Sequence, residues 1–427
     1  MKQLTKPSSW SEYALVYGLI AVSGIEFFYR SQEYVVLLFL AACLVAMIRK
    51  TALTMRPLVI ILAVFLLEQL QAVQFSNFVP TSIIAMMIRL AVVYLIMHIC
   101  GLKTVRLFVD IIYVTALISL PIYVLTFVPG AESFMIENIA KVFFRPIFHI
   151  DEGMYTTGPT ILIYNFNPFA FEIIGSSIVK RNSGPFWEPG AFGVMLNLAI
   201  ALNTIRRKSL INKQNVWMML ALATTLSTAG YVTLFIIAIG YLLTNRAISD
   251  KTKLAYLLLL VPAAGIFYSR AAFMEEKIQQ NISLTREDNT SRFGSAYLDL
   301  IDLGRSPFIG FGRLAENRFG QAAVSQDLSI HRNNGVTSLL ITYGVPAALL
   351  YFTLLFLFFW RYCKRVGFPV LFAVFAFLSV LSSGFSQVIF DRAMLLAFLF
   401  LADRLRQIQA QKPAVTPART HLTNSQA

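Results

Sequence analysis

Residues 180–193 (KRNSGPFWEPGAFG) combine side chains that can do chemistry with a backbone that cannot form a regular helix. The segment holds two cations (Lys180 and Arg181), one carboxylate (Glu188), two prolines and three glycines, and an apolar run follows it directly. A segment that only crosses a bilayer needs neither charge nor irregular backbone, and at a membrane surface both usually line a site. The segment therefore predicts a site at one face of a membrane protein.

Composition sets the class of protein around this segment. Of the 427 residues, 57% are apolar and only 14% are charged, whereas soluble domains carry about 25% charged residues. We expect an all-α polytopic membrane protein with about twelve transmembrane helices in a single domain over residues 1–410, followed by a disordered cytoplasmic tail over 411–427. The expected spans are 13–29, 34–48, 58–75, 79–99, 106–128, 190–205, 215–228, 230–244, 254–269, 336–359, 368–382 and 385–402.

Basic residues in the short connections predict the orientation. Positive charge marks cytoplasmic loops, and one alternate set of connections holds nearly all of it. That set contains Arg49, Lys50, Arg56, Lys103, Arg106, Arg206, Arg207, Lys208, Lys213, Arg246, Lys251, Lys253, Arg361, Lys364 and Arg365. We therefore expect both termini in the cytoplasm and read the net charge of +14 as a topological signal, with no nucleic-acid partner.

The same alternation places two long connections, about 130–189 and 270–335, on the outer face. The second is densely charged, and its apolar spacing suggests short helices. Within the first, the apolar and aromatic stretch 161–179 is expected to be interfacial or re-entrant, because a further span there would break the charge alternation.

Arg181 and Glu188 lie seven positions apart around a Gly-Pro pair, just before the span that starts near Gly190. One interpretation is an ion pair that fixes the loop. The other is an anion-binding arginine beside a carboxylate, at a helix N-terminus that also favours anions.

The second connection contributes further candidates. Arg292 precedes an amphipathic stretch at 297–301, and Arg313 follows a Gly-x-Gly turn whose backbone N–H groups can approach a ligand. Arg292 can also be an ordinary solvated cation. His331 stands directly ahead of the 336–359 span, where it can serve as a general base or an orienting donor, or be a plain surface histidine.

Arg89 lies well inside an apolar span, where a charge is costly unless it faces a cavity or a partner. Glu68, Gln69 and Gln71 in the preceding span are possible partners, so structural pairing and ligand binding both stay open. Asp391 and Arg392 raise the same question for the last span.

These residues predict a cavity that opens to the outer face and is rich in arginine and aromatic rings. No DxD-like or His/Asp cluster provides a magnesium site, and no cofactor is expected. Such a pocket suits a phosphate-bearing, partly lipidic substrate together with a sugar that stacks on Trp187, Phe186 or Tyr155.

The motifs resemble those of a known family. Residues 181–192 read Arg-x-x-Gly-x-Phe-x-Glu-Pro-Gly-x-Phe before a helix, which is similar to the O-antigen polymerase (Wzy) and O-antigen ligase (WaaL) superfamily of lipopolysaccharide and exopolysaccharide biosynthesis. The second loop adds Ser291-Arg292, Pro307, Gly310-Phe311-Gly312, His331, Asn334 and Gly344, and residues 226–231 resemble the family's short Ser/Gly link. The resemblance covers residues 180–350, and the Trp-Glu-Pro-Gly form leans toward polymerases.

The resemblance implies a metal-independent glycosyltransferase of the C-type fold at the periplasmic face of the bacterial inner membrane. An acceptor sugar hydroxyl attacks the anomeric carbon of an undecaprenyl-pyrophosphate-linked glycan, with inversion and release of undecaprenyl pyrophosphate. Arg181 and Arg292 match the arginines expected to bind pyrophosphate. His331 matches the histidine near the acceptor or leaving group, and Glu188 is the preferred general base or acceptor binder.

One departure from the family concerns the histidine. Ligases place Asn directly after it, whereas here Arg332 precedes Asn333 and Asn334, so Arg332 competes for phosphate. Because pyrophosphate is a good leaving group, cationic stabilisation can supply much of the catalysis, and the arginine fork suits it. The expected catalytic residues are Glu188, His331 and Arg292, and the expected substrate-binding residues are Arg181, Arg332, Asn334, Arg313, Trp187 and Arg89.

Three functions compete. The first is a polymerase that elongates repeat units, with a chain-length regulator and a flippase as possible partners. The second is a ligase that moves finished glycan to lipid A core or to protein through the same donor site. The third is a transporter or flippase, which the long charged outer loop and the sparse intramembrane charge disfavour.

Overall fold

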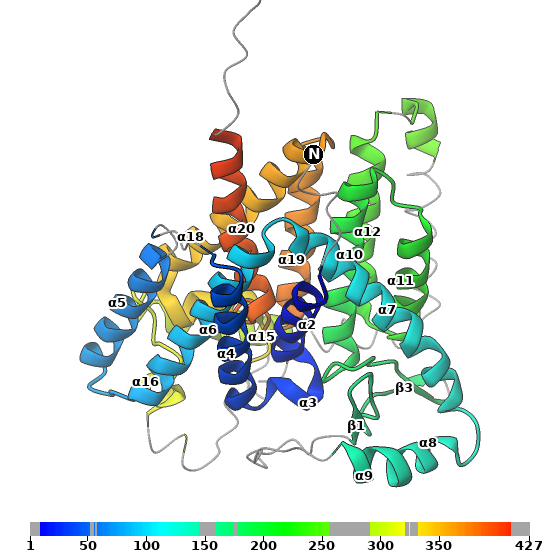
Figure 1. Ribbon diagram of the computed structural model, residues 1–427, viewed down its shortest axis with the longest axis horizontal. Coiled ribbons are helices and arrows are strands. Elements are labelled where there is room, and N and C mark those ends of the chain that lie inside the picture. The colour runs from blue at the N-terminus through cyan, green and yellow to red at the C-terminus, as the bar shows by residue number, and fades with distance from the viewer. Residues whose placement is uncertain are drawn as a thin grey trace, which may run out of the picture.

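The computed structural model describes residues 9–51, 55, 58–144, 159–174, 177–246, 248–255, 291–320, 324 and 332–410. Most of these residues are helical, and the longer helices pack side by side as a bundle (Figure 1). The first half of the bundle consists of α2 (Trp10–Gly24), α3 (Glu26–Tyr29), α4 (Gln32–Ile48), α5 (Leu58–Gln74), α6 (Pro80–Cys100) and α7 (Lys103–Leu125). The second half consists of α10 (Pro189–Arg207), α11 (Lys213–Thr224), α12 (Thr228–Thr244), α18 (Gly335–Val366), α19 (Phe372–Ser386) and α20 (Ala393–Ala410).

Most helices agree with the expected spans, but the last span, expected at 385–402, begins only at Ala393 because residues 387–392 are not helical, and 254–269 lies almost wholly outside the described residues. Within the described residues, three helices (α6, α7 and α18) are long and apolar enough to cross a membrane, and α4, α5, α12 and α19 are shorter apolar helices. These helices support a membrane protein. The count of about twelve spans and the cytoplasmic location of the termini stay predictions.

The interior of the bundle is formed by α10 and α20. Residues 191–205 of α10 and 393–402 of α20 are all buried, as is typical of helices surrounded by other helices. In contrast, α4 and α5 expose rows of leucines, among them Leu40 and Leu62, which are 57% and 55% exposed. Apolar rows of this kind suit contact with lipid. Because α10 is the most enclosed element, it holds the Glu188 segment at its start in a fixed position.

The first long connection contains both short helices and β structure. It comprises α8 (Ala131–Phe134), the π-helix η1 (Met135–Ala140), α9 (Lys141–Phe143), and the strands β1 (Thr160–Ile161), β2 (Tyr164–Asn165), β3 (Phe171–Ile174) and β4 (Ser177–Lys180). The strands form two antiparallel hairpins, β1 with β2 and β3 with β4. Figure 1 places this connection at one end of the bundle, away from the end of α20.

These hairpins qualify the all-α expectation, which describes the bundle but not residues 160–180. Hydropathy alone suggested an interfacial or re-entrant segment. The β-branched residues Ile173, Ile174, Ile178 and Val179 favour paired strands instead, and Phe171 pairs with Lys180 in register.

The second long connection contains α15 (Arg292–Leu303) and α16 (Ala315–Phe319), as its spacing suggested. The faces of α15 are unusual. Its polar residues Ser295 and Asp299 are 0% exposed, whereas Leu300 and Ile301 are each 55% exposed. Since α15 packs against α18, it turns its polar face toward the bundle.

The long helix α18 is broken at Gly344, which has φ 77° and ψ 167°. Pro346 has no N–H, so the carbonyl of Thr342 loses its usual helical donor. The second connection replaces the lost hydrogen bonds: the N–H groups of Phe311 and Gly312 donate to the carbonyls of Ile341 and Thr342 at 2.8 and 3.0 Å. In the other direction, the Val345 N–H donates to the Pro307 carbonyl at 2.8 Å. The break therefore clamps the loop to the helix.

Close approach at this clamp makes Gly344 irreplaceable. A Cβ there would stand 2.2 Å from the Phe308 carbonyl oxygen, on a backbone with positive φ. We expect Gly344→Ala to lower the melting temperature in nanodiscs by clearly more than Gly101→Ala. Gly101 also has positive φ, but no atom lies within 4 Å of its Cβ position. The control variant therefore suffers only backbone strain of about 1–2 kcal/mol. Equal shifts of the melting temperature in the two variants would contradict the clamp.

Candidate functional site

The starts of three helices, α10, α15 and α18, meet beside the segment that joins α19 to α20. A Cβ at Gly190, at the start of α10, would approach the Gln387 side chain to 2.5 Å. A Cβ at Gly335, at the start of α18, would approach the Gln387 carbonyl to 2.2 Å. Helix starts carry positive partial charge and free N–H groups, so this junction favours an anion.

The backbone of the Trp-Glu-Pro-Gly segment is held by residues outside it. The side-chain amides of Asn165 and Asn167 donate to the carbonyls of Phe186 and Trp187, each at 2.9 Å. On the other side, the N–H of Glu26 donates to the Pro185 carbonyl at 2.9 Å. The first hairpin and α3 therefore fix the segment between them, which explains how an irregular chain can present defined side chains.

Trp187 belongs to a stack of rings and cations. Its ring lies 5.1 Å from the Tyr29 ring, and the Arg392 guanidinium lies 5.1 Å from Trp187 and 5.3 Å from Tyr29. Arg30 covers Tyr29 at 5.3 Å. Cation–π contacts of this geometry hold an aromatic face in place, so Trp187 is a half-buried, pre-positioned ring.

Arg292 and Glu188 face the same junction from two helices. Glu188 is the N-cap residue of α10, and Arg292 is the first residue of α15, whose Nη1 donates to the Asn333 carbonyl. Burial lowers the pKa of the Arg292 guanidinium, and the nearby Glu188 carboxylate opposes that shift. Asn334 caps α18 by accepting from the Val336 and Thr337 N–H groups at 3.0 and 3.1 Å. The expected residues Glu188, Arg292 and Asn334 are thus brought together.

A cavity of about 330 Å³ adjoins this junction through Gly335. Its charged and phenolic groups belong to Arg89, Arg313, Tyr343 and Asp391. The volume is at the lower end for small-molecule sites. Arg89 and Arg313, both expected to bind substrate, therefore line the same enclosed space.

The partners of Arg89 differ from those the sequence suggested. Glu68 pairs with Arg313 instead, through contacts of 2.9 and 3.1 Å, and the Gln71 amide donates to the Thr342 carbonyl at the α18 break at 2.8 Å. Arg89 itself donates to Gln32 at 3.3 Å. The break in α18 explains the difference, because it created acceptors for Gln71 that a continuous helix would not have.

Arg181 lies in a different place from Arg292. Its Nε donates to the Thr225 carbonyl at 2.9 Å, in the turn between α11 and α12 that resembles the family's Ser/Gly link. The backbone N–H of Arg181 donates to the Ala170 carbonyl at 2.8 Å. The turn is shaped by Ser227, which caps α12 by accepting from the Gly230 N–H at 3.2 Å. The expected residue His331 and the ring of Tyr155 lie outside the described residues.

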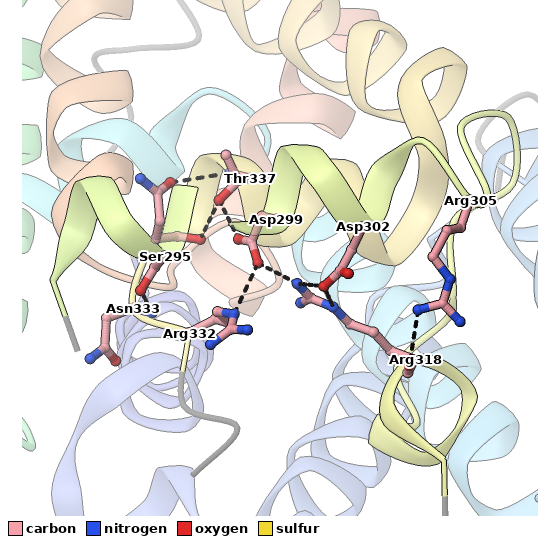
Figure 2. A network of polar contacts seen from close by, with 9 residues as sticks. Ser295, Asp299, Asp302, Arg305, Arg318, Arg332, Asn333 and Thr337 are labelled. Carbon is pink, nitrogen blue, oxygen red and sulfur yellow. Dashed lines mark hydrogen bonds and ion pairs between the residues drawn. The ribbon is translucent and has the colours of Figure 1, made fainter. Parts of the chain in front are cut away.

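A buried ion network anchors α15 to α18 (Figure 2). Asp299, which is 0% exposed, contacts Arg318 at 2.6 Å and Arg332 at 3.7 Å, and it accepts from the Thr337 hydroxyl. Asp302 adds a second carboxylate to Arg318 at 2.6 Å. This network holds Arg292, at the other end of the same helix, against the start of α18.

Arg332, which was expected to bind substrate, takes part in this network. Burial lowers the pKa of its guanidinium, as does the positive charge of Arg318, while Asp299 and Asp302 oppose the shift. Among the described residues, its Nε and Nη1 have no hydrogen-bond partner. Arg332 therefore has an anionic neighbour within the protein and donors left over for a ligand.

The junction combines cations, a carboxylate and an aromatic face without grouped metal ligands. Among the described residues, no three His, Cys, Asp or Glu side chains are close enough to hold a metal ion. Comparison with family models, curated proteins and solved structures finds no match for this chain.

Sequence reasoning missed Tyr29, Tyr343, Asp299 and Arg318. Tyr29 and Tyr343 look like ordinary aromatic residues of apolar segments, and nothing in the sequence distinguishes them from core rings. Asp299 was seen only as part of an amphipathic pattern. Asp299 lies one helical turn after Ser295, so the two side chains share a face, and apolar residues flank them in the sequence. This spacing was the signal that could have predicted a buried polar face.

Removing Asp299 should test the anchoring network. We expect Asp299→Ala to destabilise the protein by about 3–5 kcal/mol, because it leaves the buried Arg318 with a weakened counter-charge. Asp302→Ala, on the same helix, should cost no more than about 1 kcal/mol, since Arg318 keeps Asp299 and Asp302 is partly exposed. Thermal unfolding in nanodiscs measures both, and a larger loss in Asp302→Ala would contradict the network.

Proposed function

We propose that this protein is a polysaccharide polymerase of the bacterial inner membrane, which elongates undecaprenyl-pyrophosphate-linked repeat units of an O-antigen or exopolysaccharide at the periplasmic face. The observation that carries the proposal is the meeting of three helix starts with Arg292, Glu188 and Trp187 beside a polar cavity. The motif resemblance supplies the substrate class, and the junction supplies groups that fit it.

The pyrophosphate end of the donor fits the junction itself. The starts of α10 and α18 offer positive partial charge, and Arg292 adds a half-buried cation whose weakened solvation makes it a stronger partner for an anion. Glu188 limits the net charge there, so that undecaprenyl pyrophosphate can leave after transfer. In this arrangement Arg292 stabilises the negative charge that develops on the leaving group.

Trp187 fits the sugar of the donor. Its ring is held by contacts with Tyr29 and Arg392, and Glu188 follows it directly in the sequence. Sugars offer weakly polar C–H faces to aromatic rings and hydroxyl groups to carboxylates. A sugar on Trp187 would therefore have its anomeric carbon near the pyrophosphate at the helix starts.

The reaction is a substitution at that carbon. An acceptor hydroxyl oxygen forms the new bond, the bond from the anomeric carbon to the pyrophosphate oxygen breaks, and undecaprenyl pyrophosphate leaves with the electron pair. The attack from the opposite face inverts the configuration. A ligase would perform the same substitution with a different acceptor, so the two functions differ only in where the glycan goes.

Deleting the gene distinguishes these functions. We expect a deletion strain to carry single repeat units on its usual acceptor, because unit transfer continues without elongation. The measurement is gel analysis of surface glycans. A full-length lipid-linked polymer without its final acceptor would instead indicate a ligase, and an unchanged profile would contradict both.

Arg292 should be essential in the purified reaction. We expect Arg292→Gln to lower the rate of polymer formation by about 10²–10³-fold, since it removes one stabilising group at the leaving oxygen. The assay incubates purified protein in nanodiscs with lipid-linked repeat units and follows chain length. Arg305→Gln is the matched control, because Arg305 is an exposed cation of the same connection.

The control should keep the wild-type rate. An Arg292→Gln protein that is folded and forms polymer as fast as Arg305→Gln would contradict the placement of pyrophosphate at this junction.

A further inference from the structure

Two enclosed polar atoms in the cavity beside the junction have no partner. Among the described residues, neither the Tyr343 hydroxyl nor Oδ1 of Asp391 makes a hydrogen bond, although both atoms are shielded from solvent. Both residues line the 330 Å³ cavity. Buried polar atoms are nearly always bonded in folded proteins, and an unpaired one commonly marks a place for water, an ion or a ligand.

The charges around the cavity suit a neutral polar ligand. Arg313 is matched by Glu68, and the charge of Arg89 lies within range of Asp391 and of a second cation, Arg392. Two carboxylates therefore offset two of the three arginines, which leaves only a small net positive charge, in contrast to the helix starts at the junction. A sugar ring with several hydroxyl groups can satisfy the Tyr343 donor and the Asp391 acceptor together.

From this arrangement we infer that the cavity holds the acceptor sugar, with Asp391 accepting the proton of the attacking hydroxyl and Tyr343 orienting the ring. The inference rests on the proposed function and assigns its acceptor side. Asp391 adjoins Arg392, which stacks on Trp187, so the carboxylate lies at the side of the cavity nearest the proposed donor sugar.

Asp391 suits the role of base better than Glu188. The charge of Glu188 acts on Arg292 from the N-cap position of α10, where it offsets the charge of the donor site. Asp391 keeps an unbonded oxygen, and its nearest cation, Arg392 Nε, is 3.5 Å away. That separation is an ion pair and not a hydrogen bond, so the oxygen is open to a hydroxyl.

The proton balance of the step is simple. As the acceptor oxygen bonds to the anomeric carbon, its proton passes to Oδ1 of Asp391, and the electron pair of the breaking bond leaves with undecaprenyl pyrophosphate. The carboxylic acid then returns its proton to water. Because the leaving group is good, the base is needed mainly as the new bond nears completion.

The test uses an acceptor that cannot act as a donor. An alkyl glycoside of the repeat unit lacks pyrophosphate, so its KM reports the acceptor site alone when the lipid-linked donor is saturating. We expect Tyr343→Phe to raise this KM about threefold to tenfold, because the variant loses one hydrogen bond to the acceptor sugar. The melting temperature should not fall, because the lost hydroxyl has no protein partner.

Tyr351→Phe is the matched control. Its hydroxyl donates to the Phe390 carbonyl at 2.9 Å, so this variant should melt at a lower temperature and keep the acceptor KM. The reverse pattern, with KM unchanged in Tyr343→Phe, would overturn the acceptor assignment.

Asp391→Asn should lower kcat by about 10²–10⁴-fold, with the donor KM retained, and should remove the acidic limb of the pH–rate profile. Asp391→Glu should restore part of kcat and that limb, which a merely structural residue would not do. An Asp391→Asn protein with the wild-type rate and pH profile would overturn the role of Asp391.

If the wild-type protein transfers no glycan at all, the proposed function itself fails. If the wild-type protein is active and the variants are unaffected, only the acceptor site is rejected.

Discussion

The break of α18 at Gly344 is the constraint on which the rest of the site depends. Pro346 cannot donate to Thr342, and the positive φ of Gly344 turns the chain out of the helix. The carbonyls left open are filled by the N–H groups of Phe311 and Gly312. Unpaired backbone groups inside a membrane protein would cost several kcal/mol each, so the second long connection must return to this point. Its position is therefore set by hydrogen bonding and not only by apolar packing.

That return determines where the functional side chains lie. With the chain clamped near Gly312, Arg313 reaches Glu68 and the cavity, and α15 is brought across the start of α18. The buried carboxylate of Asp299 then fixes the register of α15 through Arg318 and Thr337. Two separate restraints, one of backbone and one of charge, hold the connection at both sides of the junction.

Much of the bundle could be predicted from the sequence, because long apolar stretches have few alternatives to helices. The segment at Glu188 was also recognisable, since its prolines, glycines and charges contrast with the apolar run that follows. The hairpins at 160–180 could not be recognised by hydropathy, which does not separate a strand pair from an interfacial segment. The partner of Arg89 was mistaken for a similar reason: Gln71 bonds instead to the Thr342 carbonyl, which lacks its helical donor at the break in α18.

The arrangement of arginines explains how a cation-rich interior can remain selective. Arg313 and Arg318 have carboxylate partners at 2.9 and 2.6 Å, so they hold elements together. Arg292 has a backbone carbonyl and a more distant carboxylate. A guanidinium already matched by a buried carboxylate gains little from a further anion, whereas one held by neutral oxygens keeps most of its attraction for phosphate. In the proposed function, arginine therefore serves both to hold elements together and to bind substrate, and its partner within the protein decides which.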